Sequence, residues 1–274
     1  REWAGSYNLV SEPKKIAVVM AGNIPMVGFH DFLCVLICGH SILIKTSSKD
    51  TVLMKFIANR LMDIEPRFRE SIAFAEQLKG FDAIIATGSD NASRYFEYYF
   101  GKYPCIIRKN RTSVAILHGD ETDDELKTLG TDIFSYFGLG CRNVSKIFLP
   151  TPYDVKKLFQ PWESFREIIH HHKYCNNYDY QKSILLVTST PFLDNGFVML
   201  QETSRLVSPI SVIYYEYYEN SKSLNNTLDG LSAKIQCVVE NTTESRVKFG
   251  QAQFPGLSDY ADQVDTLKFL TALP

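Results

Sequence analysis

Residues 15–47 read "KIAVVMAGNIPMVGFHDFLCVLICGHSILIKTS", and this stretch decides the fold. The short apolar run at 15–20 predicts a buried strand, and the glycines and proline after it predict a loop. Residues 30–40 carry apolar side chains at helical spacing, and the apolar run at 41–47 predicts a second strand. A strand, a helix and a strand in this order indicate an α/β protein with a parallel sheet covered on both faces.

The alternation continues along the chain. A helix is predicted at residues 49–64, a strand at 81–89 and a helix at 91–101. Together with the opening stretch they predict a first lobe with a parallel sheet over residues 1–107.

A second α/β lobe is predicted over residues 108–250. Its first elements are two strands within 103–120, broken by the polar cluster from Arg108 to Ser113. A helix at 122–138, a strand at 143–150, a long helix at 154–172 and strands at 183–189, 196–201, 210–218 and 234–240 complete it. Residues 251–274 are expected to form a C-terminal tail that returns to the first lobe or contacts another subunit.

Composition narrows the class of protein. The 274 residues, 45% of them hydrophobic, suffice for two lobes. A net charge of -2 gives no electrostatic reason to bind nucleic acid or an anionic membrane, so a small-molecule partner is favoured. Six scattered cysteines fit a reducing cytoplasm. No apolar run reaches the roughly 18 residues of a membrane span. Because the chain begins at Arg1, we expect that it lacks an N-terminal segment.

One cysteine stands at a predicted corner between helix and strand. Cys141 lies between Gly140 and Arg142 in "FGLGCRNVSKIFLP", residues 137–150. Such a corner suits a nucleophile, although a small core side chain beside a turn glycine fits equally well. A reactive thiol needs nearby cations or helix amides to lower its pKa from about 8.5, and Arg142 is a candidate.

Polar residues follow three predicted strands. They are Asn23 in "AGNIP", Lys45 in "ILIKTSS", and Gly88 with Ser89 in "ATGS". Lys45 ends its strand at the carboxyl end, where α/β sheets bind ligands. Each residue also has a structural explanation: a loop-capping asparagine, a lysine at the end of an edge strand, and an ordinary helix start.

The order of these segments resembles the aldehyde dehydrogenase superfamily. Within it, "GNIP", "RTSVAIL", "FGLGCRNVSKIFLP" and "GLSDYADQVDTLKFL" are similar to the acyl-CoA reductases of the LuxC family, and the likeness covers nearly the whole chain. The resemblance implies an aldehyde-dehydrogenase-like fold and a homo-oligomer. It also implies that residues 1–107 form the nucleotide-binding domain and residues 108–250 the catalytic domain.

The resemblance also implies roles for the residues. Cys141 attacks a carbonyl carbon, while the Asn23 side-chain amide and the Cys141 backbone N–H stabilise the oxyanion; one such donor is worth about 3 kcal/mol. Lys45 contacts the adenosine ribose, and Gly88 and Ser89 lie near the pyrophosphate.

Three departures from the superfamily pattern refine the expectation. Where NAD-preferring members have a glutamate after the lysine, this chain has Ser47 and Ser48, hydroxyls that accept the 2′-phosphate of NADPH. The glutamate that activates water has no counterpart in "IIRKNRTS". The glutamate that binds the nicotinamide ribose would fall near "SRLVSPIS", where only Glu202 is close, out of register.

The sequence therefore predicts NADPH-dependent reduction of an acyl thioester, a fatty acyl-CoA, to an aldehyde through acyl-Cys141. An aldehyde dehydrogenase that oxidises free aldehydes is the alternative enzyme. A degenerate family member that serves as a scaffold in an acyl-transfer complex is the non-enzymatic alternative.

No metal site is predicted. Three consecutive histidines at 170–172 cannot converge from one helix face, and Cys34 and Cys38 are better explained by core packing than by zinc. The aromatic run "YYEYYE" is expected in a sheet or a subunit contact rather than in a nucleic-acid surface.

Overall fold

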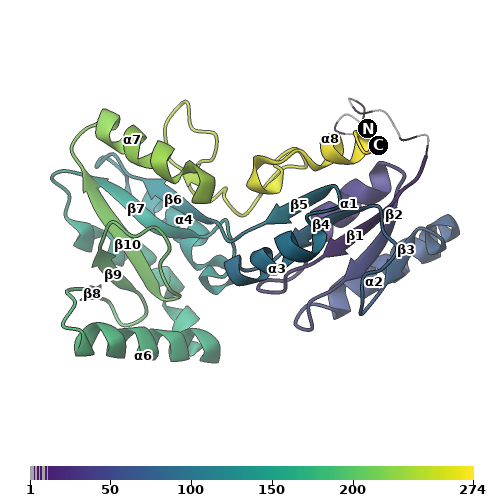
Figure 1. The fold of residues 1–274 in the computed structure, drawn as a ribbon. Coiled ribbons are helices and arrows are strands. Elements are labelled where there is room, and N and C mark those ends of the chain that lie inside the picture. The colour runs from purple at the N-terminus through teal and green to yellow at the C-terminus, as the bar shows by residue number, and fades with distance from the viewer. Residues whose placement is uncertain (1–2, 4, 6, 8–9, 11) are drawn as a thin grey trace. The chain divides into compact units, whose positions relative to one another are not determined.

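The computed structural model describes residues 3, 5, 7, 10 and 12–274. The chain divides into two compact units, Arg1–Asn110 with Gly256–Pro274, and Arg111–Pro255 (Figure 1). Each unit has its own sheet and its own hydrophobic core, and each is described on its own.

The first unit is built on a five-stranded parallel sheet with the order β3-β2-β1-β4-β5. Its strands are β1 Lys15–Val19, β2 Ser41–Lys45, β3 Ile72–Phe74, β4 Ala83–Thr87 and β5 Cys105–Arg108. The chain adds β2 and β3 on one side of β1 and then crosses to add β4 on the other. The strand order therefore reverses between β1 and β4, and ligands of open α/β sheets bind at the carboxyl ends of the strands at such a point.

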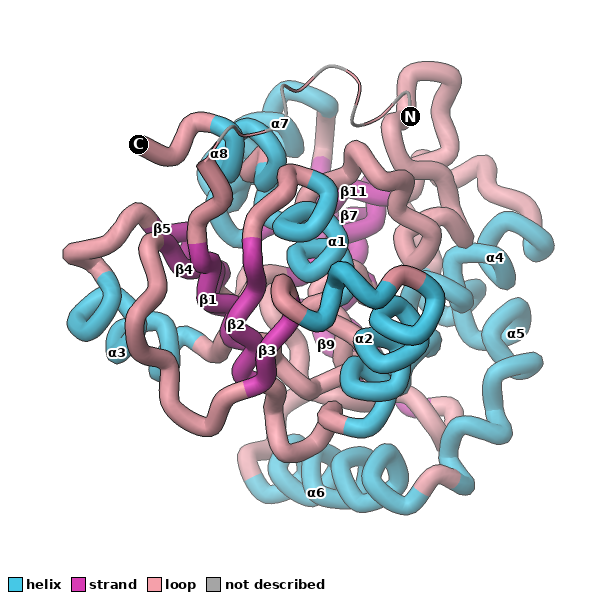
Figure 2. Tube along the Cα trace, turned by 90° about the vertical axis from the view of Figure 1, so that its right-hand side faces the viewer, coloured by secondary structure: helices cyan, strands magenta, loops and turns pink. Residues whose placement is uncertain are grey.

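Helices cover both faces of this sheet. They are α1 Phe29–Ile37, α2 Val52–Ile64, α3 Asp90–Phe100 and α8 Thr266–Thr271, with short 3-10 turns at Pro66–Arg69 and Ala261–Gln263. Side chains of α1, α2 and α8 pack with Ile16 and Val18, whereas Phe96 of α3 packs with Ala17 and Ile84. Because alternate strand residues face opposite sides, α2 and α3 lie on opposite sides of the strands, as Figure 2 shows.

A buried ion pair ties the C-terminal residues into the first unit. The Arg108 guanidinium donates to the Asp31 carboxylate at 2.7 Å, to the Ala261 carbonyl at 2.6 Å and to Thr266 Oγ1 at 3.0 Å. Arg108 is 3% exposed, so this cation depends on its partners for solvation. The pair joins α1, β5 and the start of α8.

The second unit is built on a six-stranded sheet with the order β11-β6-β7-β10-β9-β8. Neighbouring strands run parallel except for the short β8. The strands are β6 Thr112–Ile116, β7 Val144–Pro150, β8 Leu193–Asp194, β9 Met199–Glu202, β10 Val212–Tyr218 and β11 Ile235–Val239.

Two layers of helices enclose this sheet. They are α4 Asp123–Phe134, α5 Phe159–Trp162, α6 His172–Val187 and α7 Ser221–Leu231, with 3-10 segments at Ser135–Gly138, Val155–Leu158, Glu163–His170 and Ser232–Lys234. Helices α4 and α5 pack with Ile147 and Ile213, while α6 packs with Met199 and α7 with Phe148. Trp162, fully buried, donates its indole N–H to the Leu126 carbonyl at 2.9 Å.

Most predicted elements are confirmed, and two predictions are wrong. The long helix at 154–172 is instead a series of short 3-10 and α segments. The strand at 183–189 is the end of α6. A short apolar run does not distinguish a strand from a helix, and this run is largely surface, since Leu186 is 61% and Val187 85% exposed. The short β3 and β8 and the helices α7 and α8 were not predicted.

Candidate functional site

The first sheet gathers the strand-end residues at one edge. Strands β2, β1 and β4 are adjacent and parallel, and Val19 is in register with both Lys45 and Ala86. The Met20 N–H donates to the Lys45 carbonyl at 3.0 Å, which continues the ladder beyond β1. The loops that carry Asn23, Lys45 to Ser48, and Gly88 with Ser89 therefore all leave the same carboxyl edge, on both sides of the point where the strand order reverses.

The loop that carries Asn23 is held by two contacts. A Cβ on Gly22 would lie 2.5 Å from Ser47 Oγ, so only glycine allows the loops after β1 and β2 to touch. On the other side of Asn23, the buried carboxylate of Asp50 accepts the Met26 N–H at 2.5 Å. Asn23 itself is exposed between these two anchors.

The loop after Lys45 closes into a compact turn. The Thr51 hydroxyl donates to the Ser47 carbonyl at 2.9 Å, and the Lys49 N–H donates to Ser47 Oγ at 3.3 Å. The Ser47 side chain is thus occupied within the turn, whereas Lys45 and Ser48 are exposed. Of the two serines, Ser48 is the more accessible to a ligand.

Gly88 and Ser89 start helix α3. Ser89 is its N-cap, since Ser89 Oγ accepts the Ala92 N–H at 3.2 Å. A Cβ on Gly88 would lie 2.8 Å from the Phe96 ring and 2.9 Å from Ala92, so glycine lets the strand approach the helix closely. The amide end of α3, which favours an anion, therefore lies at the carboxyl edge of β4.

Cys141 lies in the second unit, in the turn between the 3-10 segment Ser135–Gly138 and β7. The Asn143 N–H donates to the Gly140 carbonyl at 3.1 Å and closes this turn. Cys141 is exposed, and its carbonyl accepts a hydrogen bond from Ser113 Oγ at 3.0 Å. In contrast to the edge of the first sheet, this position is at the amino end of the strand.

Two residues near the turn, Arg142 and His171, make structural contacts of their own. The Arg142 guanidinium donates to the Ala252 carbonyl at 3.4 Å, so it has a structural partner. The His171 ring stacks on Phe137, with 3.9 Å between ring centroids, so one residue of the histidine run supports the segment before Cys141.

The other cysteines have different surroundings. Cys34 and Cys38 are buried in the first unit; burial raises the pKa of the Cys34 thiol and raises that of Cys38 to about 11. Cys105, Cys175 and Cys237 are partly buried. The structure describes all six cysteines, and Cys141 is the exposed one. The thiolate is the nucleophile, and burial disfavours it. The exposed Cys141 is therefore the strongest candidate for the nucleophile.

Sequence reasoning missed three residues that hold these loops, Asp50, Ser113 and Asn143. Asp50 acts on a loop 24 residues away, and Ser113 on a carbonyl 28 residues away. Such long-range contacts leave no local pattern. Only Asn143, which follows Cys141 by two positions, had a local signal, because asparagine side chains often bond to nearby backbone.

The part of the chain that the structure describes contains neither of two further features. No cluster of three or more histidine, cysteine, aspartate or glutamate side chains there could hold a metal ion. No helix in that part is both long and apolar enough to cross a membrane.

Solved structures with a similar fold are aldehyde dehydrogenases. Aldehyde dehydrogenase 21 from Physcomitrella patens, in complex with the reaction product succinate, has a TM-score of 0.68 at 10% identity, over 94% of this chain and 67% of that one. The Mycobacterium tuberculosis aldehyde dehydrogenase complexed with NAD+ has a TM-score of 0.59 at 14% identity, over 84% of this chain and 57% of that one. The chain spans about three fifths of the length of such structures.

At these identities the likeness shows the fold, which is the aldehyde dehydrogenase fold expected from the sequence. No curated protein sequence matches the chain. The family model described as acyl-CoA reductase (LuxC) matches residues 2–157, which is more than half of the chain and includes both the Asn23 loop and Cys141. The chain therefore belongs to the LuxC family of acyl-CoA reductases.

Proposed function

We propose that the protein reduces an acyl thioester, a fatty acyl-CoA, to an aldehyde with NADPH, through a covalent acyl group on Cys141. The observation that carries the proposal is the exposed Cys141 in a hydrogen-bonded turn, in a chain of this family. Its family membership and its fold support a nicotinamide-dependent oxidoreductase.

The covalent step is an acyl transfer between thiols. The Cys141 thiolate attacks the thioester carbonyl carbon, the bond to the CoA sulfur breaks, and the CoA thiolate leaves and takes a proton from water. NADPH, when bound, supplies the hydride that converts the acyl-cysteine into a hemithioacetal oxyanion. Breaking the carbon–sulfur bond of that species releases the aldehyde and restores the Cys141 thiolate.

Each tetrahedral species carries a negative oxygen that needs hydrogen-bond donors. The backbone N–H of Cys141 and the side-chain amide of Asn23 are the proposed donors. The contacts that hold the Asn23 loop, Gly22 against Ser47 and Asp50 to Met26, support this role. Donors fixed before the reaction stabilise the transition state without a cost of reorganisation.

The carboxyl edge of the first sheet suits a dinucleotide. Lys45 and Ser48 would contact the adenosine ribose and its 2′-phosphate, and the amide end of α3 at Gly88 and Ser89 would face the pyrophosphate. Ser47 contributes through the turn that its side chain stabilises. The proposed preference for NADPH rests on the hydroxyls of Ser47 and Ser48, which stand where a carboxylate would repel the 2′-phosphate.

Two further parts of the proposal rest on the family and on the cysteines. The superfamily implies a homo-oligomer. Six cysteines that are all free thiols fit a reducing compartment, the cytoplasm.

A purified sample would be mixed with fatty acyl-CoA and NADPH, and the consumption of NADPH and the formation of aldehyde would be measured. We expect one aldehyde for each NADPH consumed in the unmodified protein and no reaction in Cys141→Ser. Cys105→Ser is the matched control and should retain activity.

The same sample also tests the alternatives. Oxidation of free aldehyde to acid without CoA, at a higher rate than the reduction of acyl-CoA, would favour the aldehyde dehydrogenase. The absence of both reactions and of NADPH binding would favour the scaffold and overturn the proposal.

A further inference from the structure

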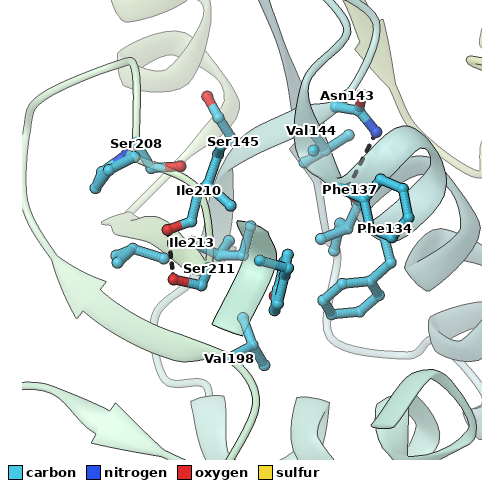
Figure 3. A pocket seen from close by; sticks show the side chains of 15 residues that line it. Phe134, Phe137, Asn143, Val144, Ser145, Val198, Ser208, Ile210, Ser211 and Ile213 are labelled. Carbon is cyan, nitrogen blue, oxygen red and sulfur yellow. Dashed lines mark hydrogen bonds between the residues drawn. The ribbon is translucent and has the colours of Figure 1, made fainter. Parts of the chain in front are cut away.

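Asn143 uses both ends of its side chain to fix the segment that carries Cys141. Its Nδ2 donates to the carbonyls of Asp132 at 3.0 Å, Ile133 at 3.1 Å and Ser135 at 2.8 Å, and its Oδ1 accepts the Gly140 N–H at 2.8 Å. Asn143 is 2% exposed. Figure 3 shows the side chain reaching the end of the helix beside Phe134.

These bonds join the end of helix α4 to the cysteine turn. The last carbonyls of a helix have no intrahelical partner, and the two hydrogens of the Asn143 amide are shared among three carbonyls at this end. The same side chain then binds the first peptide of the turn at Gly140. The turn is therefore attached to the helix by one buried residue.

Ser113 is a second anchor, and it comes from a different element. It lies on β6, is fully buried, and donates its hydroxyl to the Cys141 carbonyl at 3.0 Å. The Asn143 N–H meanwhile donates to the Gly140 carbonyl. Both peptide carbonyls that flank the Cys141 α-carbon are thus engaged by buried residues.

The orientation of the amide hydrogens follows from peptide geometry. Both peptide bonds are trans, so each N–H points opposite to the carbonyl of the same peptide. The Gly140 and Cys141 carbonyls point toward buried donors. The N–H groups of Cys141 and Arg142 therefore point away from those donors.

A pocket lies beside Asn143. Its volume is about 30 Å³, and it is lined by Phe137, Gly138, Asn143 and Val144 together with residues 208–213 (Figure 3). Residues 139–142 are not among those that line it, so the pocket does not adjoin Cys141 itself. The contacts that hold the turn are the hydrogen bonds of Asn143 and Ser113.

We propose that Asn143 and Ser113 are positioning residues, which aim the Cys141 backbone N–H at the oxyanion formed during acyl transfer. The proposal rests on the proposed function insofar as Cys141 is the nucleophile. It differs from a role in stability alone, because it predicts loss of a donor that only reactions with an oxyanion require.

The test compares two reactions of the same thiol in Asn143→Ala and in Ser113→Ala. Acylation of Cys141 by fatty acyl-CoA forms an oxyanion, whereas alkylation by iodoacetamide displaces iodide from a tetrahedral carbon and forms none. We expect each variant to lower the acylation rate constant by about 10²-fold or more, as loss of an oxyanion donor does elsewhere. The alkylation rate constant should stay within about threefold, because the thiol remains exposed.

Asn241→Ala is the matched control. Its amide donates to Glu125 at 3.0 Å and its Oδ1 accepts the Phe249 N–H at 3.1 Å, so it removes comparable bonds from the same unit without touching the turn. Both rate constants should be unchanged in this variant. If Asn143→Ala fails to fold, Ser113→Ala, which removes one hydroxyl, is decisive.

Unchanged acylation in a folded variant would overturn the proposal, and so would an equal fall in both rate constants. Acylation by 4-nitrophenyl acetate, a simple activated ester, separates this result from a failure of the proposed function. If the unmodified protein reacts with the ester at Cys141 but not with acyl-CoA, the function fails while the positioning roles are still tested.

Discussion

The two units place their candidate groups at opposite ends of parallel strands. In the first unit, Asn23, Lys45 and Ser48 are exposed on loops at carboxyl ends, and close backbone packing at Gly22 holds the edge. In the second, Cys141 lies at the amino end of β7, and buried side chains hold its turn. Sheet topology gathers the candidate binding groups at the first edge, whereas the candidate nucleophile at the amino end of a strand is held by the side chains of Asn143 and Ser113.

The largest expected effect is on the stability of the first unit, because the comparison treats the two cores as independent. Arg108→Met leaves the Asp31 carboxylate buried without its partner, and breaking a buried pair costs about 3–5 kcal/mol. Hydrogen exchange of β4 should accelerate accordingly, while exchange of β7 should not change. Lys109→Met removes an exposed pair with Glu97 and should alter stability by less than about 1 kcal/mol. Equal acceleration in β4 and β7 would show that the two cores unfold together.

A smaller effect should follow from filling the close approach at the first edge. Gly22→Ala places a Cβ 2.5 Å from Ser47 Oγ, and overpacking of this kind costs about 1–3 kcal/mol. Ser47→Gly in the same chain should restore much of the loss, as measured by urea unfolding. Gly230→Ala, which meets no atom within 4 Å in helix α7, should be neutral or stabilising. A loss at Gly22 that Ser47→Gly does not reduce would contradict the contact.

A charge introduced on the exposed side of that edge should change cofactor affinity rather than stability. Ser48→Glu places a carboxylate where we propose the 2′-phosphate, so NADPH affinity should fall about tenfold more than NADH affinity, a difference of about 1.4 kcal/mol. Ser48→Gln has a similar size without the charge and serves as the control. Fluorescence titration with each cofactor measures both constants, and equal losses for the two would count against the assignment.

Two buried groups should give pH dependences of opposite sign, one in each unit. Burial raises the pKa of Asp132 from 3.8 to about 6, so its ionised form is disfavoured in the folded state, and Asp132 contributes increasing stability to the second unit as pH falls from 6 toward 4. Burial lowers the pKa of His40 below 6.5, so the unfolded chain binds a proton first, and the first unit loses stability below pH 6.5.

Variants isolate these two contributions. Asp132→Asn should remove the gain in the second unit, and His40→Gln should reduce the loss in the first, as measured by hydrogen exchange of β7 and β4 at several pH values. A pH slope that neither substitution changes would contradict this account.

Much of the fold was predictable because its signals are local. The apolar runs of β1 and β2 and the helical spacing of α1 lie within one stretch of sequence. The placement of β4 beside β1, which brings Gly88 to the same edge as Asn23 and Lys45, is seen only in the folded sheet. The end of α6 was predicted to be a strand because a short apolar run does not distinguish a strand from a helix; in the structure Leu185 is buried, whereas Leu186 and Val187 are exposed.

The supports of the candidate site were not predictable for a physical reason. The contacts of Ser113 with Cys141 and of Asp50 with Met26 join residues far apart in sequence, so only the folded chain brings them together. Asn143 is local, but three carbonyls at the end of α4 become its partners only where that helix stops at Phe134.

The most direct test of the central claim is mass spectrometry of the protein after mixing with fatty acyl-CoA in the absence of NADPH. Residues 106–113 supply no carboxylate to activate water, and a positioned general base accelerates such a step by about 10² to 10⁴-fold. We therefore predict a persistent acyl group on the peptide that contains Cys141, removed when NADPH is added and absent from Cys141→Ser. Rapid release of free fatty acid, or an acyl group on another cysteine, would contradict the account.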